Sequence, residues 1–191
     1  MLKNLFFHRM VNNLFALIIQ CFNKYFILLC FLFRMKITAL HVGKTDDKNL
    51  EALIQEYIPR IKRYVNFWHD FVTVSKNTGK LKPEEIKKIE GELLLKKMSI
   101  ADYVILLDEH GRQYTSISFS THLQKLMNTG YKNIFFVSGG AYGFSDDVKM
   151  KANEFLSLSS LTTTHQLVRL FFTEQLYRAI TILNNHPYHN E

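Results

Sequence analysis

Cysteine is nearly absent from this chain, and its placement excludes several kinds of chemistry. The two cysteines, Cys21 and Cys30, both lie within the first 34 of the 191 residues. The stretch from Met35 to Glu191 therefore has no disulfide, no cysteine-based metal site and no thiol that could act as a nucleophile. Any chemistry of that stretch must come from other side chains.

Acidic residues are missing from the first 34 positions, which carry four of the chain's cations: Lys3, Arg9, Lys24 and Arg34. The whole chain has a formal net charge of +7, so 7 − 4 leaves +3 for everything from residue 35 onward. A balance this mild permits binding to nucleic acid but does not require it, because most surface Lys and Arg side chains are simply solvated.

A long uninterrupted apolar run is also missing from residues 1–34. Polar residues such as Asn12 and Gln20 break the segment below the roughly 18 to 20 residues that a membrane-spanning helix needs. No small-residue cleavage site precedes Arg34, as a signal peptide would require. A membrane-associated helix remains an alternative. We favour a start of translation at Met35, with residues 1–34 an upstream extension and residues 35–191 a single cytoplasmic domain.

The remaining chain alternates between two hydrophobic patterns. Apolar runs rich in β-branched and aromatic residues predict strands at Ile37–Val42, Phe67–Val74, Tyr103–Leu107 and Ile134–Val137. Three- and four-residue spacing predicts helices at Leu50–Ile61, with a kink or break at Pro59, and at Pro83–Met98, Ser116–Asn128, after Ser145, and at Gln166–Leu183. This alternation indicates an α/β fold with a mostly parallel sheet and helices on both faces.

Glycines follow one of these strands as Gly139-Gly140-x-x-Gly143. Their spacing does not fit the dinucleotide-binding fingerprint, and alone they are typical of a turn that needs positive φ. Ligands bind at the carboxyl ends of strands in parallel sheets. Leu107, Gly139 and the segment Leu158–Thr163 all stand at such ends.

Several motifs in the last third occur together in one order. They are Phe136–Gly143, Leu156–Thr162, His165-Gln166-x-x-Arg169, Glu174–Ala179 and His186-Pro187-Tyr188-His189. From Met35 to Glu191 the chain resembles the ribosomal RNA large subunit methyltransferase H family, which belongs to the knotted SPOUT class. It departs from the family pattern at Thr164, where a proline is expected, and at Ala141-Tyr142, where many relatives carry Pro-Glu.

The resemblance implies a trefoil-knot fold, a homodimer with a shared active site, and transfer of a methyl group from S-adenosylmethionine. The expected target is N3 of a pseudouridine in 23S ribosomal RNA, as free RNA or within the assembled ribosome. No metal is expected. The implied cofactor residues are Leu107, Gly139, Leu158, Ser159, Ser160, Leu161, Thr162 and Thr163.

Methylation of a ring nitrogen needs a positioned proton acceptor but no covalent attack on the base, so a body without cysteine is consistent with it. We expect Tyr188 and His189 to position the base and handle its proton, with His186 nearby. We expect His165 and Arg169 to form the site wall and contact phosphate. A lone histidine is more often structural than catalytic, which remains the competing interpretation.

Other interpretations remain open. The chain could be a non-catalytic α/β module that binds RNA or a nucleotide, or a protein tethered to a membrane through residues 1–34. Lys76, Lys80 and Lys82 could face RNA or simply be solvated. The last predicted helix carries apolar residues on more than one side, which predicts a second partner such as another copy of the chain.

Overall fold

The computed structural model describes residues 35–74 and 81–188. Five parallel strands form one sheet in the order β2-β1-β4-β3-β5. The strands are β1 (Lys36–Val42), β2 (Asn66–Val72), β3 (Tyr103–Gln113), β4 (Asn133–Ser138) and β5 (Glu154–Ser157). The helices are α2 (Lys48–Lys62), α3 (Pro83–Lys97), α4 (Ser116–Asn128), α5 (Asp146–Lys151) and α6 (His165–Leu183), with the 3₁₀ turn η2 (Met98–Ile100). The predicted α/β fold with a parallel sheet is confirmed.

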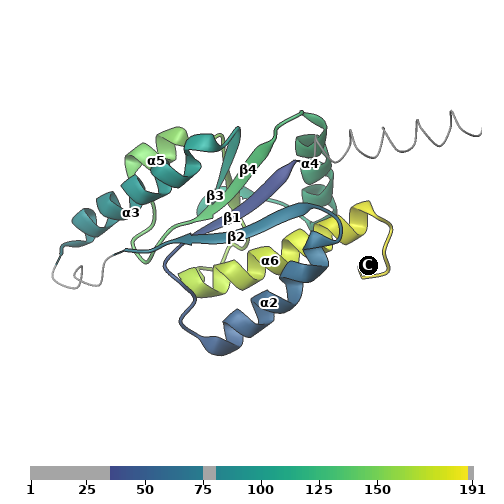
Figure 1. The fold of residues 1–191 in the computed structure, drawn as a ribbon, viewed down its shortest axis with the longest axis horizontal. Helices are drawn as coiled ribbons and strands as arrows, with labels where there is room; N and C mark the ends of the chain where they lie inside the picture. The colour runs from purple at the N-terminus through teal and green to yellow at the C-terminus, as the bar shows by residue number, and fades with distance from the viewer. Residues whose placement is uncertain (1–34, 75–80, 189–191) are drawn as a thin grey trace, which may run out of the picture. The chain divides into compact units, whose positions relative to one another are not determined.

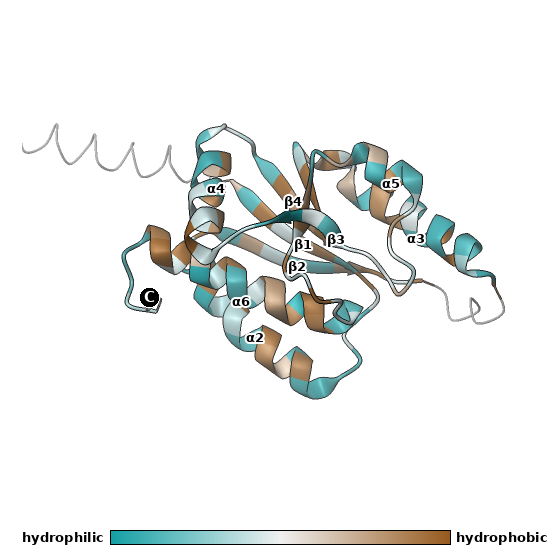
Figure 2. Ribbon diagram, turned by 180° about the vertical axis from the view of Figure 1, so that it is seen from behind, coloured by the Kyte–Doolittle hydropathy of each residue, from teal (hydrophilic) through white to brown (hydrophobic). Residues whose placement is uncertain are grey.

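Helices cover both faces of this sheet, as Figure 1 shows. The four residues Ile134 to Val137 of β4 are all at most 3% exposed. Ile134 and Phe136 pack with α2, α4 and α6, whereas Phe135 and Val137 pack with α3 and α5. In Figure 2 hydrophobic residues alternate with hydrophilic ones along α3 and α5, as expected for helices with one face on the sheet. The apolar runs are therefore strands buried on both faces.

Side-chain caps fix where the α2, α4 and α6 helices begin. The Asp47 carboxylate accepts from the N–H groups of Asn49 and Leu50 at the start of α2, and the hydroxyls of Thr115 and Thr164 cap α4 and α6. The break predicted at Pro59 is wrong, because α2 continues to Lys62. Pro59 lies on the exposed side of α2, where water can replace the hydrogen bond that proline removes.

The β3 strand differs most from expectation. It was predicted to end at Leu107 but runs to Gln113, interrupted by a bulge: Leu107 and Arg112 both align with Leu156 of β5. A Cβ atom at Gly111 would lie 2.5 Å from the backbone of β5, so only glycine permits this approach. The bulge places Asp108 and Glu109 beside the carboxyl ends of β4 and β5, with the Asp108 carboxylate accepting from the His110 N–H at 3.0 Å.

Several expectations lie outside the described residues: the membrane tether in residues 1–34, Lys76, Lys80 and His189. The start of translation at Met35 stays a prediction. Lys82 is described; it is exposed and its N–H donates to the Glu85 carboxylate at the start of α3, 2.9 Å away. Within residues 35–74 and 81–188, every helix is too short or too polar to cross a membrane.

Candidate functional site

A cavity of about 370 Å³ lies at the β3 bulge and the carboxyl ends of β4 and β5. Its walls come from the β3 bulge, the glycine loop after β4 and the segment between β5 and α6. Seven of the eight predicted cofactor residues line it: Leu107, Gly139, Leu158, Ser159, Leu161, Thr162 and Thr163. The eighth, Ser160, is exposed and does not line it. We call this space the strand-end cavity.

The glycine loop turns back on itself at the floor of this cavity. The Gly143 N–H donates to the Gly140 carbonyl at 3.2 Å, and these two residues form an isolated bridge. A Cβ atom at Gly139 would lie 3.1 Å from the Gly143 backbone. A larger residue at position 139 would therefore displace the backbone of the glycine loop.

The segment between β5 and α6 is held by its own hydroxyl groups. The Ser157 hydroxyl donates to the Ser159 carbonyl at 2.9 Å, and the Ser159 hydroxyl accepts from the Leu161 N–H at 2.9 Å. The Thr162 hydroxyl donates to the Glu109 carboxylate at 3.3 Å, which joins this segment to the β3 bulge. The cavity is thus walled by chain that is already ordered, as ligand sites usually are.

His165 is the first residue of α6 and lines the strand-end cavity. Burial lowers the pKa of its imidazole, the positive charge of Arg169 lowers it further, and Asp46 opposes both. The ring is therefore neutral near pH 7. Just before it, the Thr164 hydroxyl accepts from the Leu167 N–H at 3.2 Å. The departure from the family's proline at position 164 thus supplies a helix cap.

Arg169 lies away from this cavity, although it is only one turn along α6 from His165. Its side chain is 1% exposed and donates to the Val42 carbonyl at 2.6 Å and to the Thr45 hydroxyl at 3.1 Å. These bonds tie the start of α6 to the end of β1. The structure does not bring Arg169 together with the predicted cofactor residues.

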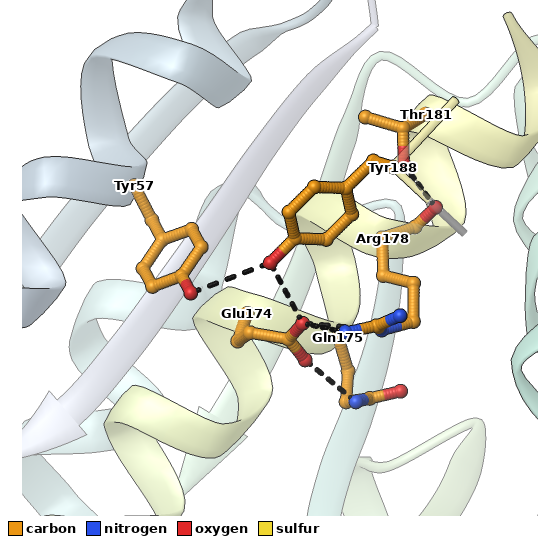
Figure 3. A network of polar contacts seen from close by, with 6 residues as sticks. All are labelled: Tyr57, Glu174, Gln175, Arg178, Thr181 and Tyr188. Atoms are coloured by element: carbon orange, nitrogen blue, oxygen red, sulfur yellow. Dashed lines mark hydrogen bonds and ion pairs between the residues drawn. The ribbon is translucent and has the colours of Figure 1, made fainter. Parts of the chain in front are cut away.

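Tyr188 lies beyond the other end of α6, folded back against the helix in the network of Figure 3. Its hydroxyl donates to the Glu174 carboxylate at 3.1 Å and is 3.4 Å from the Tyr57 hydroxyl. The Arg178 guanidinium, paired with Glu174, lies 4.9 Å above the Tyr188 ring. Burial, together with Tyr57 and Glu174, raises the pKa of Tyr188, so the phenol stays protonated at neutral pH.

Sequence reasoning gave no individual role to four residues that these contacts single out. Glu174 and Arg178 are four positions apart on α6, a spacing that predicts an ion pair on one face. Asp108 and Glu109 line the cavity, but no pattern in the sequence indicates the bulge that puts them there.

His186 is exposed, and its N–H donates to the Thr181 carbonyl, so the tail turns back directly after α6.

The two groups of predicted residues contact different parts of one helix. The strand-end cavity adjoins the first turn of α6 through His165 and Val168. Tyr188 contacts Glu174 and Arg178, from the middle of the helix onward. His165 and Glu174 are nine residues apart, which at a rise of 1.5 Å each is about 14 Å along the helix. A single chain therefore brings the cofactor residues together, but not the cofactor residues with the tail.

Comparison with known proteins identifies the family of this chain. The family described as "Predicted SPOUT methyltransferase" matches residues 35–189. Two proteins named "Ribosomal RNA large subunit methyltransferase H" are similar over 82% of this chain: that of Christiangramia forsetii is 51% identical with 99% of its length covered, and that of Flavobacterium psychrophilum is 49% identical with 100% covered. A probable methyltransferase from Bordetella pertussis is a looser structural match, with TM-score 0.48 and 11% identity over 78% of this chain and 97% of its own. The chain belongs to the SPOUT methyltransferase family.

Proposed function

We propose that this protein transfers a methyl group from S-adenosylmethionine to N3 of a pseudouridine in the 23S ribosomal RNA of the large subunit. The observation that carries the proposal is the strand-end cavity, where seven of the eight predicted cofactor residues meet. The names of relatives about half identical to this chain support the ribosomal substrate. The proposed setting is the cytoplasm, where ribosomes are made.

The residues of the cavity fit S-adenosylmethionine. Its volume of about 370 Å³ lies within the range of small-molecule sites. Leucines 107, 156, 158 and 161 offer an apolar surface for the adenine. The carboxylates of Asp108 and Glu109 also line it, and they suit the positive charges of the sulfonium and amino groups. When bound, the cofactor supplies an electrophilic methyl group.

The tail network would hold the base that accepts this methyl group. N3 would give its proton to an acceptor in the site and bond to the methyl carbon, while the carbon–sulfur bond of the sulfonium would break and its electron pair would stay on sulfur, leaving S-adenosylhomocysteine. Tyr188 keeps its own proton, because its raised pKa leaves the phenol neutral. We therefore assign Tyr188 to stacking and positioning, with Glu174 and Arg178 holding its ring and hydroxyl. Proton handling then falls to His189, as the sequence predicts, and His165 forms part of the cavity wall.

A homodimer would complete the site. None of the residues that Tyr188 contacts lines the strand-end cavity, so we infer that the tail that acts on a given cavity comes from a second copy. Large apolar side chains are exposed near the cavity: Tyr142 at 48%, Leu161 at 76% and Leu167 at 41%. Such a patch suits a protein partner. The family's trefoil knot, with the segment between β5 and α6 as its cofactor loop, is part of the same proposal.

The test is methyl transfer from labelled S-adenosylmethionine to ribosomes taken from a strain that lacks this gene. We expect one labelled nucleotide, and mass spectrometry of digested RNA should identify it as N3-methylated pseudouridine. Free 23S RNA in a parallel reaction distinguishes the two forms of substrate. Saturable cofactor binding with no transfer to either substrate would instead indicate a non-catalytic RNA-binding module.

A further inference from the structure

A second cavity, of about 430 Å³, lies on the other side of β1 from the strand-end cavity. It opens between the carboxyl ends of β1 and β2 and the helices α2 and α6. The residues that matter for its chemistry are His41, His69, Arg169, Lys44, Lys62 and Glu51. We call it the histidine cavity. The proposed methyl transfer gives this cavity no role.

Three nitrogen atoms around the histidine cavity are buried and lack a hydrogen-bond partner among the described residues. They are Nε of Arg169 and Nε2 of His41 and of His69. The side chains of His41 and Arg169 are at most 1% exposed. Arg169 Nε always carries a hydrogen, so it can only donate. Buried donors in proteins are normally paired, which points to an acceptor that arrives from solvent.

The rest of each side chain is held in place, so these nitrogens are preorganised. His41 Nδ1 is 2.7 Å from the Ser138 hydroxyl of β4, and the His41 and His69 rings lie 4.7 Å apart. The two terminal nitrogens of Arg169 donate hydrogen bonds to the Val42 carbonyl and the Thr45 hydroxyl. When the Ser138 hydroxyl donates to Nδ1, the hydrogen of neutral His41 sits on Nε2, and that nitrogen becomes a donor.

The charge of the histidine cavity selects the kind of acceptor. Lys44, Lys62 and Arg169 are cationic and Glu51 is anionic, so the lining is net positive even with both histidines neutral. Burial lowers the pKa of both imidazoles, and they also lie near the charge of Arg169. Burial also lowers the pKa of the Arg169 guanidinium, whereas the negative charges of Asp46 and Glu51 raise it. A ligand with several acceptor oxygens and negative charge fits this arrangement.

We propose that the histidine cavity binds a phosphate group, received by Arg169, His41 and His69, with Lys44 and Lys62 at its rim. The phosphate could belong to the backbone of an RNA or to a free phosphate or phosphomonoester, because both present the same oxygens. The proposal does not depend on methyl transfer, since none of these residues lines the strand-end cavity.

The probe is inorganic phosphate titrated into the ¹⁵N-labelled protein, with the imidazole nitrogens followed by NMR. The Nε2 signals of His41 and His69 should shift as phosphate is added. The shift should approach saturation at a phosphate concentration of about 10 mM, as a millimolar Kd predicts. The exposed His186 lies beyond the far end of α6 and serves as the internal reference. No saturable shift at His41 and His69 would overturn the proposal and leave water as the occupant.

Variants show whether the shift reports binding at this cavity. Lys44→Gln with Lys62→Gln changes only exposed side chains and should weaken phosphate binding about threefold or more. His69→Leu removes one donor and should weaken it about tenfold. Lys88→Gln, an exposed position on α3 beyond the sheet, is the matched control and should leave affinity unchanged. Equal affinity in all of these variants would overturn the proposal.

A short single-stranded RNA oligonucleotide separates the two sources. If it competes with phosphate at the His69 signal, the cavity receives an RNA backbone phosphate. If phosphate binds and the oligonucleotide does not compete, the ligand is a free phosphate or phosphomonoester. Because both measurements are made without S-adenosylmethionine, their outcome is independent of the methyl-transfer assay.

Discussion

The first turn of α6 and the part of the helix from its middle onward have different surroundings. At its first turn, Thr164 caps the helix and His165 joins a cavity lined by leucines and hydroxyl groups. From its middle onward, Glu174 and Arg178 form a charged and aromatic network with Tyr188. Under the proposed function, the first half of α6 adjoins the small-molecule cofactor and the second half holds the base. The two halves that act together then belong to different copies.

Removing the tail should have the largest effect on methyl transfer. A chain that stops at Pro187 loses the Tyr188 hydroxyl and the predicted proton acceptor. We expect methyl transfer to fall about 100- to 10,000-fold, because a positioned acid or base contributes that much. S-adenosylmethionine affinity, measured by calorimetry, should stay unchanged. Loss of cofactor binding as well would place the tail in the cofactor site.

Gly139→Val tests the opposite end. The added carbons would meet the Gly143 backbone, since a Cβ atom alone would lie 3.1 Å from it, and the loop would move into the cavity. We expect no measurable cofactor binding in a protein that still unfolds cooperatively. Ser160→Val is the matched control, because Ser160 does not line the cavity. Normal affinity in Gly139→Val would remove Gly139 from the site.

Mixing these two inactive proteins tests whether the ends work in pairs. Random exchange makes half of the dimers mixed, and each mixed dimer has one intact cavity facing one intact tail. Activity should therefore recover to about a quarter of that of the parent protein. Sedimentation of the parent residues 35–191 should show a dimer at micromolar concentration. A stable monomer, or no recovery on mixing, would contradict the shared site.

Glu174→Gln should have a smaller effect, confined to the tail end. It removes the charge that pairs with Arg178 and accepts from Tyr188. Hydrogen bonds to a charged group are worth about 1.5 to 3 kcal/mol, so methyl transfer should fall about 10- to 100-fold. Glu56→Gln, an exposed position on α2, is the control. A fall in cofactor affinity would show that Glu174 acts at the other end too.

The smallest predicted effect is the pH dependence of stability that arises from His41, a buried residue of β1. Burial lowers the pKa of His41 well below its usual 6.5, so the unfolded chain takes up a proton there more readily than the folded one. The free energy of unfolding should therefore fall as pH drops below about 6.5, by about 1.4 kcal/mol per pH unit. His41→Leu should flatten this slope in urea denaturation between about pH 7.5 and 5.5. An unchanged slope would assign the effect to other groups.

The sequence predicts the layers better than the edges of the fold. Ile134 to Val137 are identified as a buried strand because all four are apolar, and the end of the last helix was placed at Leu183 where it ends. The extension of β3 beyond Leu107 could not be foreseen, because it depends on Gly111 meeting a strand more than forty residues later. Local pattern carries no information on such a contact.

The same limit applies to the site. The cofactor residues could be predicted because family motifs mark them, and all but Ser160 meet in one cavity. Arg169 was expected beside them, but its carbonyl partner Val42 is 127 residues away in the sequence and holds it elsewhere. A side chain on a helix can point to either side of its neighbours, and only the packed structure decides which.

The β1 strand lies between β2 and β4 in the sheet, and this position affects how the protein folds. It pairs with β2 about thirty residues later, but also with β4 about a hundred residues later. Long sequence separation between partners slows folding, because a long loop must close before the contact can form. During synthesis β1, α2 and β2 can therefore associate early. The edge of β1 that pairs with β4 stays without its partner strand until β4 is synthesised. The strand-end cavity, which needs β4, β5 and α6, is completed last.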